Sequence, residues 1–213
     1  MSHDSPTATL SSISPEGMTL TVHAFGDSRD VHTPALHPRA DQFFVESCRG
    51  QDTLDEAVSG WLVKMEPYVT MRPSGHPRAI VVVDELVQVT GDDLVAWGRL
   101  LARLQTPECK TVMVCGGVVV DPASDYDTLG ALAAALIRQR LGQFIGVGPS
   151  AKPIATQVGL EGSWDGESVW AETPHRAYDY LCDEVRESDV VVVVALHPAD
   201  LADLMSRWGG VVR

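Results

Sequence analysis

The chain has 213 residues, 45% of them apolar, and its 29 acidic and 16 basic side chains give a formal net charge of −13. These values are typical of a soluble globular protein with one ordinary domain and a small additional one. The negative charge argues against a nucleic-acid partner, because Lys and Arg make most contacts to a phosphate backbone. Only three residues are lysine, and none follows a glycine as the phosphate-binding motif G-x-x-x-x-G-K-[ST] requires.

No apolar run approaches the roughly 20 residues that span a bilayer. The N-terminus also lacks the basic and apolar regions of a secretory signal. We therefore expect a cytoplasmic protein without membrane insertion. The four cysteines are scattered without a C-x-x-C pair, so the sequence predicts reduced, partly buried thiols and no metal site.

The first part of the chain mixes polar and apolar segments. Residues 1–14 are rich in Ser, Thr and Pro and are predicted to form a disordered arm. Residues 18–25 alternate between apolar and polar side chains, which predicts a half-buried strand. Residues 27–41 contain two prolines and are expected to be a loop with at most one short strand.

Apolar residues at helical spacing predict one helix near Phe43 and a second over residues 53–62. At the start of the second helix, Thr53 and Glu56 match a capping box. Pro67 is expected to end this second helix. Residues 72–78 hold two prolines and a glycine, which makes them the best candidate for a linker.

From residue 79 onward, buried strand patterns alternate with helical patterns. The predicted strand and helix pairs are 79–84 with 91–104, 111–116 with 128–141, 144–147 with 150–158, 168–171 with 174–187, and 189–195 with 199–208. Continuous β-branched runs such as 190–194 are typical of strands buried on both faces. Five such pairs predict an α/β fold, with a parallel sheet covered by helices on both faces.

The carboxyl ends of the strands form the edge where open α/β sheets bind ligands. The candidate ligand crevice at this edge consists of Asp84, Glu85, Gly116, Gly148 and His197. The two acids suit a metal, a ribose hydroxyl or an amine, and equally the start of a helix. The glycines suit a phosphate or a tight turn, and they lack the G-x-G-x-x-G spacing. The histidine suits a general base or a helix cap, and no catalytic residue is assigned.

Several segments together resemble the Mur ligase family. They are residues 54–67, the strand 80–85, and residues 129–134, 145–154 and 161–168. The similarity is strongest to the C-terminal part of the UDP-N-acetylmuramoyl-tripeptide:D-alanyl-D-alanine ligases, and it covers about residues 17–210. The resemblance implies a Rossmann-like C-terminal domain over 76–213 and, over 15–75, a small α+β remnant of the ligases' central ATP-binding domain.

The sequence departs from the family at four functional motifs. At the domain junction, Val69-Thr70 replaces Gly-Arg, and Arg72 is out of register. Asp84 is kept, but after Glu85 the residues Leu-Val-Gln-Val-Thr replace the family's Tyr-Asn-Ala-Asn-Pro. Gly116-Gly-Val-Val-Val-Asp-Pro replaces Gly-Asp-Met-x-Glu-Leu-Gly, and Ala195-Leu-His-Pro replaces Lys-Gly-Ser-Arg. These changes remove amide and cationic groups that would hold ligands.

The resemblance therefore favours a truncated, non-catalytic Mur-ligase-like protein without a cofactor, serving as a binding or regulatory module linked to peptidoglycan precursor synthesis. We expect a protein partner, such as a cell-wall synthesis enzyme, and a homo-oligomer stays open. Trp61, Trp164 and Trp170 are candidate anchors for a partner, because tryptophan is enriched at interface hot spots, and core packing is expected for at least one of them. Two alternatives remain: an acceptor-binding subunit of a two-chain ATP-dependent ligase, and a binder of a nucleotide or amino acid.

Overall fold

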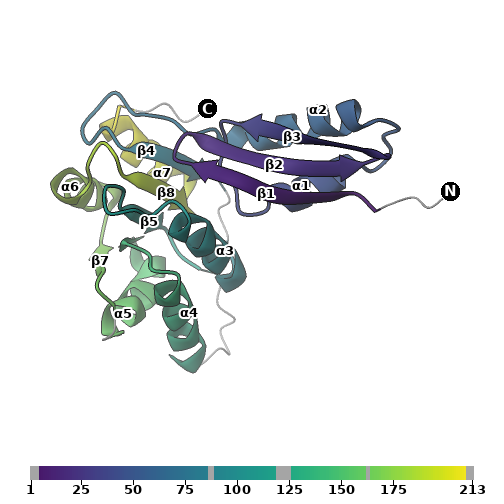
Figure 1. The fold of residues 1–213 in the computed structure, drawn as a ribbon. Coiled ribbons are helices and arrows are strands. Elements are labelled where there is room, and N and C mark those ends of the chain that lie inside the picture. The colour runs from purple at the N-terminus through teal and green to yellow at the C-terminus, as the bar shows by residue number, and fades with distance from the viewer. Residues whose placement is uncertain (1–4, 86–88, 119–125, 162–163, 210–213) are drawn as a thin grey trace. The chain divides into compact units, whose positions relative to one another are not determined.

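The computed structural model describes residues 5–85, 89–118, 126–161 and 164–209 (Figure 1). The chain divides into two compact units, Met1–Thr70 and Met71–Arg213, and each is described by itself. This division lies close to the boundary after residue 75 that the sequence predicts.

The first unit is built on a three-stranded antiparallel sheet. Its strands, in the order β1-β2-β3, are β1 (Thr7–Ser14), β2 (Gly17–Ala24) and β3 (Asp27–Thr33). Helices α1 (Ala40–Ser47) and α2 (Leu54–Met65) pack against each other and against the sheet, and a 3-10 turn, η1 (Glu66–Tyr68), follows. The predicted half-buried strand is confirmed in β2, where the alternate residues Met18, Leu20 and Val22 are buried.

The sequence predictions for the two outer strands of this sheet differ in outcome, and the one for the first strand is wrong. The segment predicted as a disordered arm contains β1 over Thr7–Ser14, paired with β2 and interrupted by a register shift between Leu10 and Ser12. Residues 27–41, predicted as a loop with at most one short strand, contain one strand, β3. Backbone pairing to β2 orders both strands, and this pairing does not require apolar side chains.

The start of α2 follows the prediction in part. Thr53 caps the helix, because its hydroxyl accepts the Glu56 N–H at 3.3 Å. The Glu56 carboxylate accepts the Asp52 N–H and the Thr53 hydroxyl. Trp61 lies in the core with no exposed surface, and its indole N–H donates to the Ala40 carbonyl at 2.8 Å. Trp61 therefore stabilises this unit from within and is not a partner anchor, which agrees with the expectation that at least one of the three tryptophans packs in the core.

The second unit contains a parallel sheet in the order β4-β8-β5-β6-β7. Its five strands are β4 (Ile80–Asp84), β5 (Thr111–Cys115), β6 (Gln143–Val147), β7 (Glu167–Ala171) and β8 (Val190–Val194). The helices between and after them are α3 (Gly91–Ala102), α4 (Tyr126–Arg138), α5 (Lys152–Leu160), preceded by the 3-10 turn η2 (Pro149–Ala151), α6 (Pro174–Glu184) and α7 (Pro198–Arg207). The predicted α/β architecture with a mainly parallel, Rossmann-like sheet is confirmed.

Helices cover both faces of this sheet, as the sequence predicts. On one face, α6 and α7 join alternate strand residues such as Val81 and Val193 in one buried cluster. On the other face, α5 approaches β6 so closely that a Cβ on Gly146 would lie 2.8 Å from the Ala155 side chain. Each fully buried valine side chain contributes about 1.5–3 kcal/mol, so the valine-rich strands supply much of the driving force for this fold.

The predicted linker over residues 72–78 is packed against the second unit. The Trp208 indole, which has no exposed surface, donates to the Pro77 carbonyl at 2.6 Å. The Arg72 guanidinium donates to the Glu187 carbonyl at 2.9 Å, and Gly75 lies against the backbone of Trp208. Just before this segment, Met71 pairs with Val81 through two backbone hydrogen bonds of 2.8 Å, antiparallel to β4. The linker prediction is therefore wrong.

Candidate functional site

The five predicted crevice residues lie along one edge of the parallel sheet. They follow the carboxyl ends of β4, β5, β6 and β8, which are neighbours in the order β4-β8-β5-β6. The helices after β5 and β8 lie on opposite faces of the sheet, so their loops separate at this edge. Such a switch point is where open α/β sheets commonly bind ligands.

The two acids after β4 have different surroundings. Asp84 is 3% exposed, and its Oδ2 accepts a hydrogen bond from the indole N–H of Trp97 at 3.0 Å. This bond ties α3 to the end of β4, and a buried polar group requires such a partner. Glu85, the next residue, is exposed. Asp84 therefore acts in the packing of the domain, while Glu85 faces solvent.

The two glycines also differ. A Cβ on Gly116 would lie 2.2 Å from the Ala195 carbonyl oxygen, so glycine lets the ends of β5 and β8 meet. Gly148 has φ +78°, a left-handed conformation that favours glycine, and space around it is open. Its carbonyl accepts the Trp170 indole N–H at 2.8 Å, and the Lys152 ammonium lies 4.2 Å from the Trp170 ring centroid. This cation–π pair occupies the surface beside Gly148.

His197 precedes α7 as its N-cap. Its Nδ1 accepts the backbone N–H of Ala199 at 3.3 Å, while Pro198 occupies the first helical position. Of the two roles that the sequence allows for His197, the structure shows the helix cap. The neighbouring Leu196 is buried at 3% exposure, whereas Leu86, two residues after Asp84, lies outside the described residues.

Cys115, the last residue of β5, is buried close to this edge. Burial raises the pKa of its thiol to about 12, and the thiol donates a hydrogen bond to the Gly117 carbonyl at 3.5 Å. Because the thiolate is the reactive form, this cysteine is chemically inert at neutral pH. The sequence-based expectation of a buried, reduced thiol is confirmed for Cys115.

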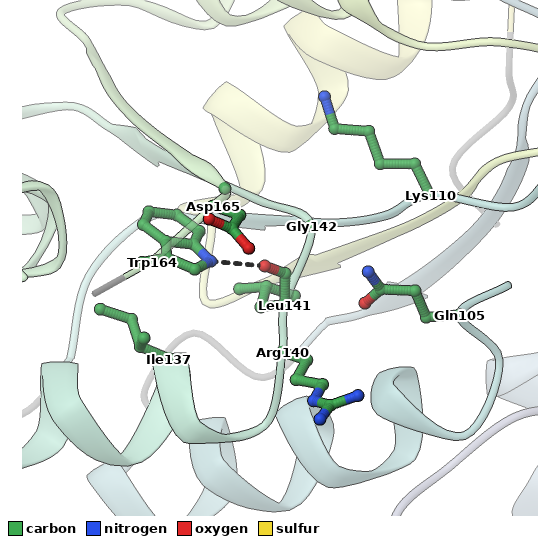
Figure 2. A pocket seen from close by; sticks show the side chains of 9 residues that line it. Gln105, Lys110, Ile137, Arg140, Leu141, Gly142, Trp164 and Asp165 are labelled. Atoms are coloured by element: carbon green, nitrogen blue, oxygen red, sulfur yellow. Dashed lines mark hydrogen bonds between the residues drawn. The ribbon is translucent and has the colours of Figure 1, made fainter. Parts of the chain in front are cut away.

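A pocket that the sequence did not predict lies at the opposite, amino-terminal edge of the same sheet (Figure 2). It has a volume of about 630 Å³ and is formed by the segments that enter β5, β6 and β7. Its lining includes Gln105, Lys110, Arg140, Trp164 and Asp165. Figure 2 shows Trp164 and Asp165 on one side of the pocket and Gln105 on the other.

One sequence signal for this pocket was available. Lys110 is one of only three lysines, and it directly precedes a buried strand. Arg140 lies three residues before the next strand, which begins at Gln143. Two cations before adjacent parallel strands must lie near each other, but the rule that ligands bind at carboxyl ends directed attention to the other edge.

No family model matches the sequence, and no curated protein sequence is significantly similar to it. Solved structures of Mur ligases share its fold. MurF from Acinetobacter baumannii is 17% identical, with a TM-score of 0.63 over 97% of this chain and 46% of that structure. MurF from Thermotoga maritima in complex with ADP is 12% identical, with a TM-score of 0.64 over 96% of this chain and 46% of that one.

UDP-N-acetylmuramate-alanine ligase (MurC) from T. maritima is 13% identical, with a TM-score of 0.61 over 98% of this chain and 46% of its own. The chain therefore spans less than half the length of these ligases. The resemblance to Mur ligases and the fold that it implies are confirmed. Among the residues that the structure describes, no helix has the length and apolar character needed to cross a membrane.

Proposed function

We propose that this chain is a non-catalytic Mur-ligase-like protein that acts as a binding or regulatory module in peptidoglycan precursor synthesis. We place it in the cytoplasm, with a protein partner and without nucleic acid. The fold shared with MurF and MurC supports the connection to precursor synthesis. The proposal rests on fold and site together, because fold alone does not define function.

The observation that carries the proposal is the internal use of the ligand-binding edge. Asp84 bonds Trp97, Gly116 packs against Ala195, and His197 caps α7. A ligand at this edge would have to compete with contacts that hold the domain together. Groups that bind substrate in an enzyme are instead preorganised toward the reacting molecule.

The surface around Trp170 is our candidate for partner binding. Trp170 is 36% exposed in β7, with the Lys152 ammonium stacked on its ring. Its indole N–H is already satisfied by the Gly148 carbonyl, so the ring presents apolar surface without an unpaired donor. Aromatic residues beside a cation are typical of binding hot spots.

The first experiment tests for catalysis and substrate binding. The purified chain is titrated with ATP, UDP-N-acetylmuramoyl-tripeptide and D-alanyl-D-alanine in a calorimeter, and phosphate release is measured in parallel. We expect no phosphate release and no Kd below about 10 µM, roughly −7 kcal/mol. Tighter binding of a nucleotide or an amino acid compound would overturn the proposal and favour the small-molecule binder.

The second experiment tests the partner and the two-chain alternative. Each Mur ligase of the same organism is purified and mixed with this chain, and complex formation and ligase activity are measured. We expect one ligase to bind, with a changed rate, and Trp170→Ala to weaken the complex by about tenfold or more. Tyr180→Ala is the matched control, because Tyr180 is an exposed aromatic residue on a different element, α6.

The outcomes separate the alternatives. ATP turnover that requires both this chain and a partner that is inactive alone would support the acceptor-binding subunit. If no ligase of the organism binds, the regulatory role is wrong. Light scattering of the chain alone decides whether it forms a homo-oligomer.

A further inference from the structure

The last strand in the order of the parallel sheet, β7 (Glu167–Ala171), has an open outer side (Figure 1). Its inner side pairs with β6, and within the described residues no strand or isolated bridge lies on the other side. β7 has five residues, as every other strand of this sheet does, so this edge is not shortened. An open edge presents backbone N–H and C=O groups with which another strand can pair.

The hydrogen bonds to β6 identify the backbone groups of β7 that face outward. In a parallel pair, alternate residues of a strand direct both their N–H and their C=O to the same neighbour. The Ala171 carbonyl accepts the Gly148 N–H at 2.9 Å, so Ala171 and Val169 face β6. Ser168 and Trp170 therefore direct two N–H and two C=O groups to the outer side. Within the described part of the chain, none of these groups has a backbone partner.

The other outer strands of the two sheets carry features that hinder strand addition. Met71 pairs with Val81 on the outer side of β4. β1 is interrupted by a register shift, and three of the seven residues of β3 are charged. Irregular pairing and charged side chains are common ways in which proteins protect an edge strand. β7, with the sequence Glu-Ser-Val-Trp-Ala, has no proline, no register shift and one charged residue.

The side chains of β7 give its two faces different chemistry. The Ser168 hydroxyl donates to the Ala155 carbonyl of α5 at 2.7 Å. The Lys152 ammonium, also from α5, lies 4.2 Å from the Trp170 ring centroid and has no ion pair among the described residues. Glu167 points to the opposite face, because successive side chains of a strand alternate. The face of the edge beside α5 therefore combines an exposed aromatic ring with an unpaired cation.

We propose that β7 binds an extended segment of a partner protein as an additional strand, and that this segment places an acidic side chain beside Lys152. The inference rests on the proposed function, because it gives a binding mode for the partner surface around Trp170. The outward backbone groups of Ser168 and Trp170 hold the segment by strand pairing. An apolar side chain of the segment packs on the Trp170 ring, and a carboxylate meets the ammonium.

A second copy of this chain fits the edge less well than a partner segment does. When two copies pair in antiparallel directions, their α5 sides lie on the same face of the joined sheet. The second β7 then brings only Ser168 and Trp170 to this face, and neither supplies a carboxylate for Lys152. Two copies, each with a net charge of −13, also repel each other.

Amide hydrogen exchange measured by NMR on the full chain tests the strand addition. The probe is a capped peptide, Thr-Val-Thr-Glu-Thr-Val-Thr, which as a strand places Val, Glu and Val on one face, and a control peptide has Lys in place of Glu. At saturation we expect exchange of the Ser168 and Trp170 amides to slow by at least about tenfold, while the Val169 amide, which faces β6, stays unchanged. The Lys peptide should bind about fivefold more weakly. Contact with the Trp170 ring alone would not give this alternation.

Matched variants separate backbone pairing from side-chain contact. Ser168→Pro removes an outward N–H but no hydrogen bond to β6, so it blocks the edge and keeps the sheet. Ser168→Ala loses the same hydroxyl and keeps the N–H. Relative to Ser168→Ala, we expect Ser168→Pro to weaken peptide binding by about tenfold. Lys152→Met should make the Glu and Lys peptides bind equally. Urea denaturation checks that each variant folds, and the exchange pattern of the native chain decides if Ser168→Pro does not.

The same exchange measurement on a complex with a Mur ligase separates this inference from the proposed function. If a ligase binds while the Ser168 and Trp170 amides exchange as in the free chain, the strand addition is wrong and the proposed function stands. If no ligase binds, the proposed function is wrong and the peptide alone decides the edge. Protection that appears without peptide and rises with protein concentration assigns the edge to a second copy and overturns the proposal. Absence of protection by both the peptide and any bound ligase overturns it as well.

Discussion

Asp84 and Trp97 form a buried contact that links the end of β4 to α3. Trp97→Phe removes the indole donor and leaves the buried carboxylate oxygen without that bond. We expect a loss of about 1–3 kcal/mol in the free energy of unfolding. Asp84→Asn, which keeps an acceptor oxygen, should cost less. Urea denaturation of both variants measures the difference, and an equal or larger loss in the asparagine variant would show that charge, rather than this bond, matters.

The raised pKa of Cys115 makes stability depend on alkaline pH. Burial raises this pKa from its ordinary value of 9.0 to about 12, so the folded state keeps a proton that the unfolded chain loses above pH 9. Raising the pH therefore lowers the free energy of unfolding. The loss is about 1.4 kcal/mol for each pH unit above pH 9. Denaturation at pH 8, 9 and 10 should show this loss in the native chain and a shallower loss in Cys115→Ala. If stability fell equally with pH in the native chain and in Cys115→Ala, the Cys115 thiol would not be the source of the pH dependence.

For single residues at the carboxyl edge of the sheet, the sequence could predict where each residue lies. It could not predict what most of them contact. Each strand ends where the hydrophobic pattern ends, so Asp84, Gly116 and His197 could be placed along one edge from sequence. Their roles depend on partners distant in sequence, such as Trp97 for Asp84 and Ala195 for Gly116. The helix cap of His197 could be foreseen, because its partner, Ala199, is only two residues away.

At the scale of elements, α7 depends on the cap that His197 provides. His197→Ala removes the acceptor for the Ala199 N–H, and we expect a loss of about 0.5–2 kcal/mol. His197→Asn keeps a side-chain acceptor at the same position and should restore most of the stability. The denaturation midpoints of the two variants measure this. If both lose stability equally, the cap is not the source of the effect.

The elements themselves were predicted with unequal success. In the second unit, strands could be recognised by continuous valine runs and helices by their amphipathic spacing. Every predicted strand and helix is present. In the first unit, β1 was missed because Thr7–Ser14 contains only Ala8, Leu10 and Ile13 as apolar residues. A polar strand at a sheet edge carries little hydrophobic signal, since backbone pairing to β2 is what orders it.

At the scale of the whole molecule, the boundary between the two units can be tested by dissection. We expect residues 71–213 to fold cooperatively alone, because their core clusters lie within that range. A fragment that starts at residue 79 loses the Pro77 carbonyl that the buried Trp208 indole uses, and it should be less stable by about 1–3 kcal/mol. Thermal unfolding followed by circular dichroism compares the two fragments, and equal midpoints would mean that residues 71–78 add nothing.

The strand pairing of Met71 with Val81 limits how the parallel sheet can grow. It occupies the outer side of β4 at Val81, near the start of that strand, whereas within the described residues no strand pairs with the outer side of β7. Free backbone groups on an edge strand are a template for adding another strand. Two copies joined through β7 would leave no free β7 edge at which a third copy could add a strand. Association through β7 alone would thus end in a closed, two-fold symmetric pair, and that edge could not propagate a fibre.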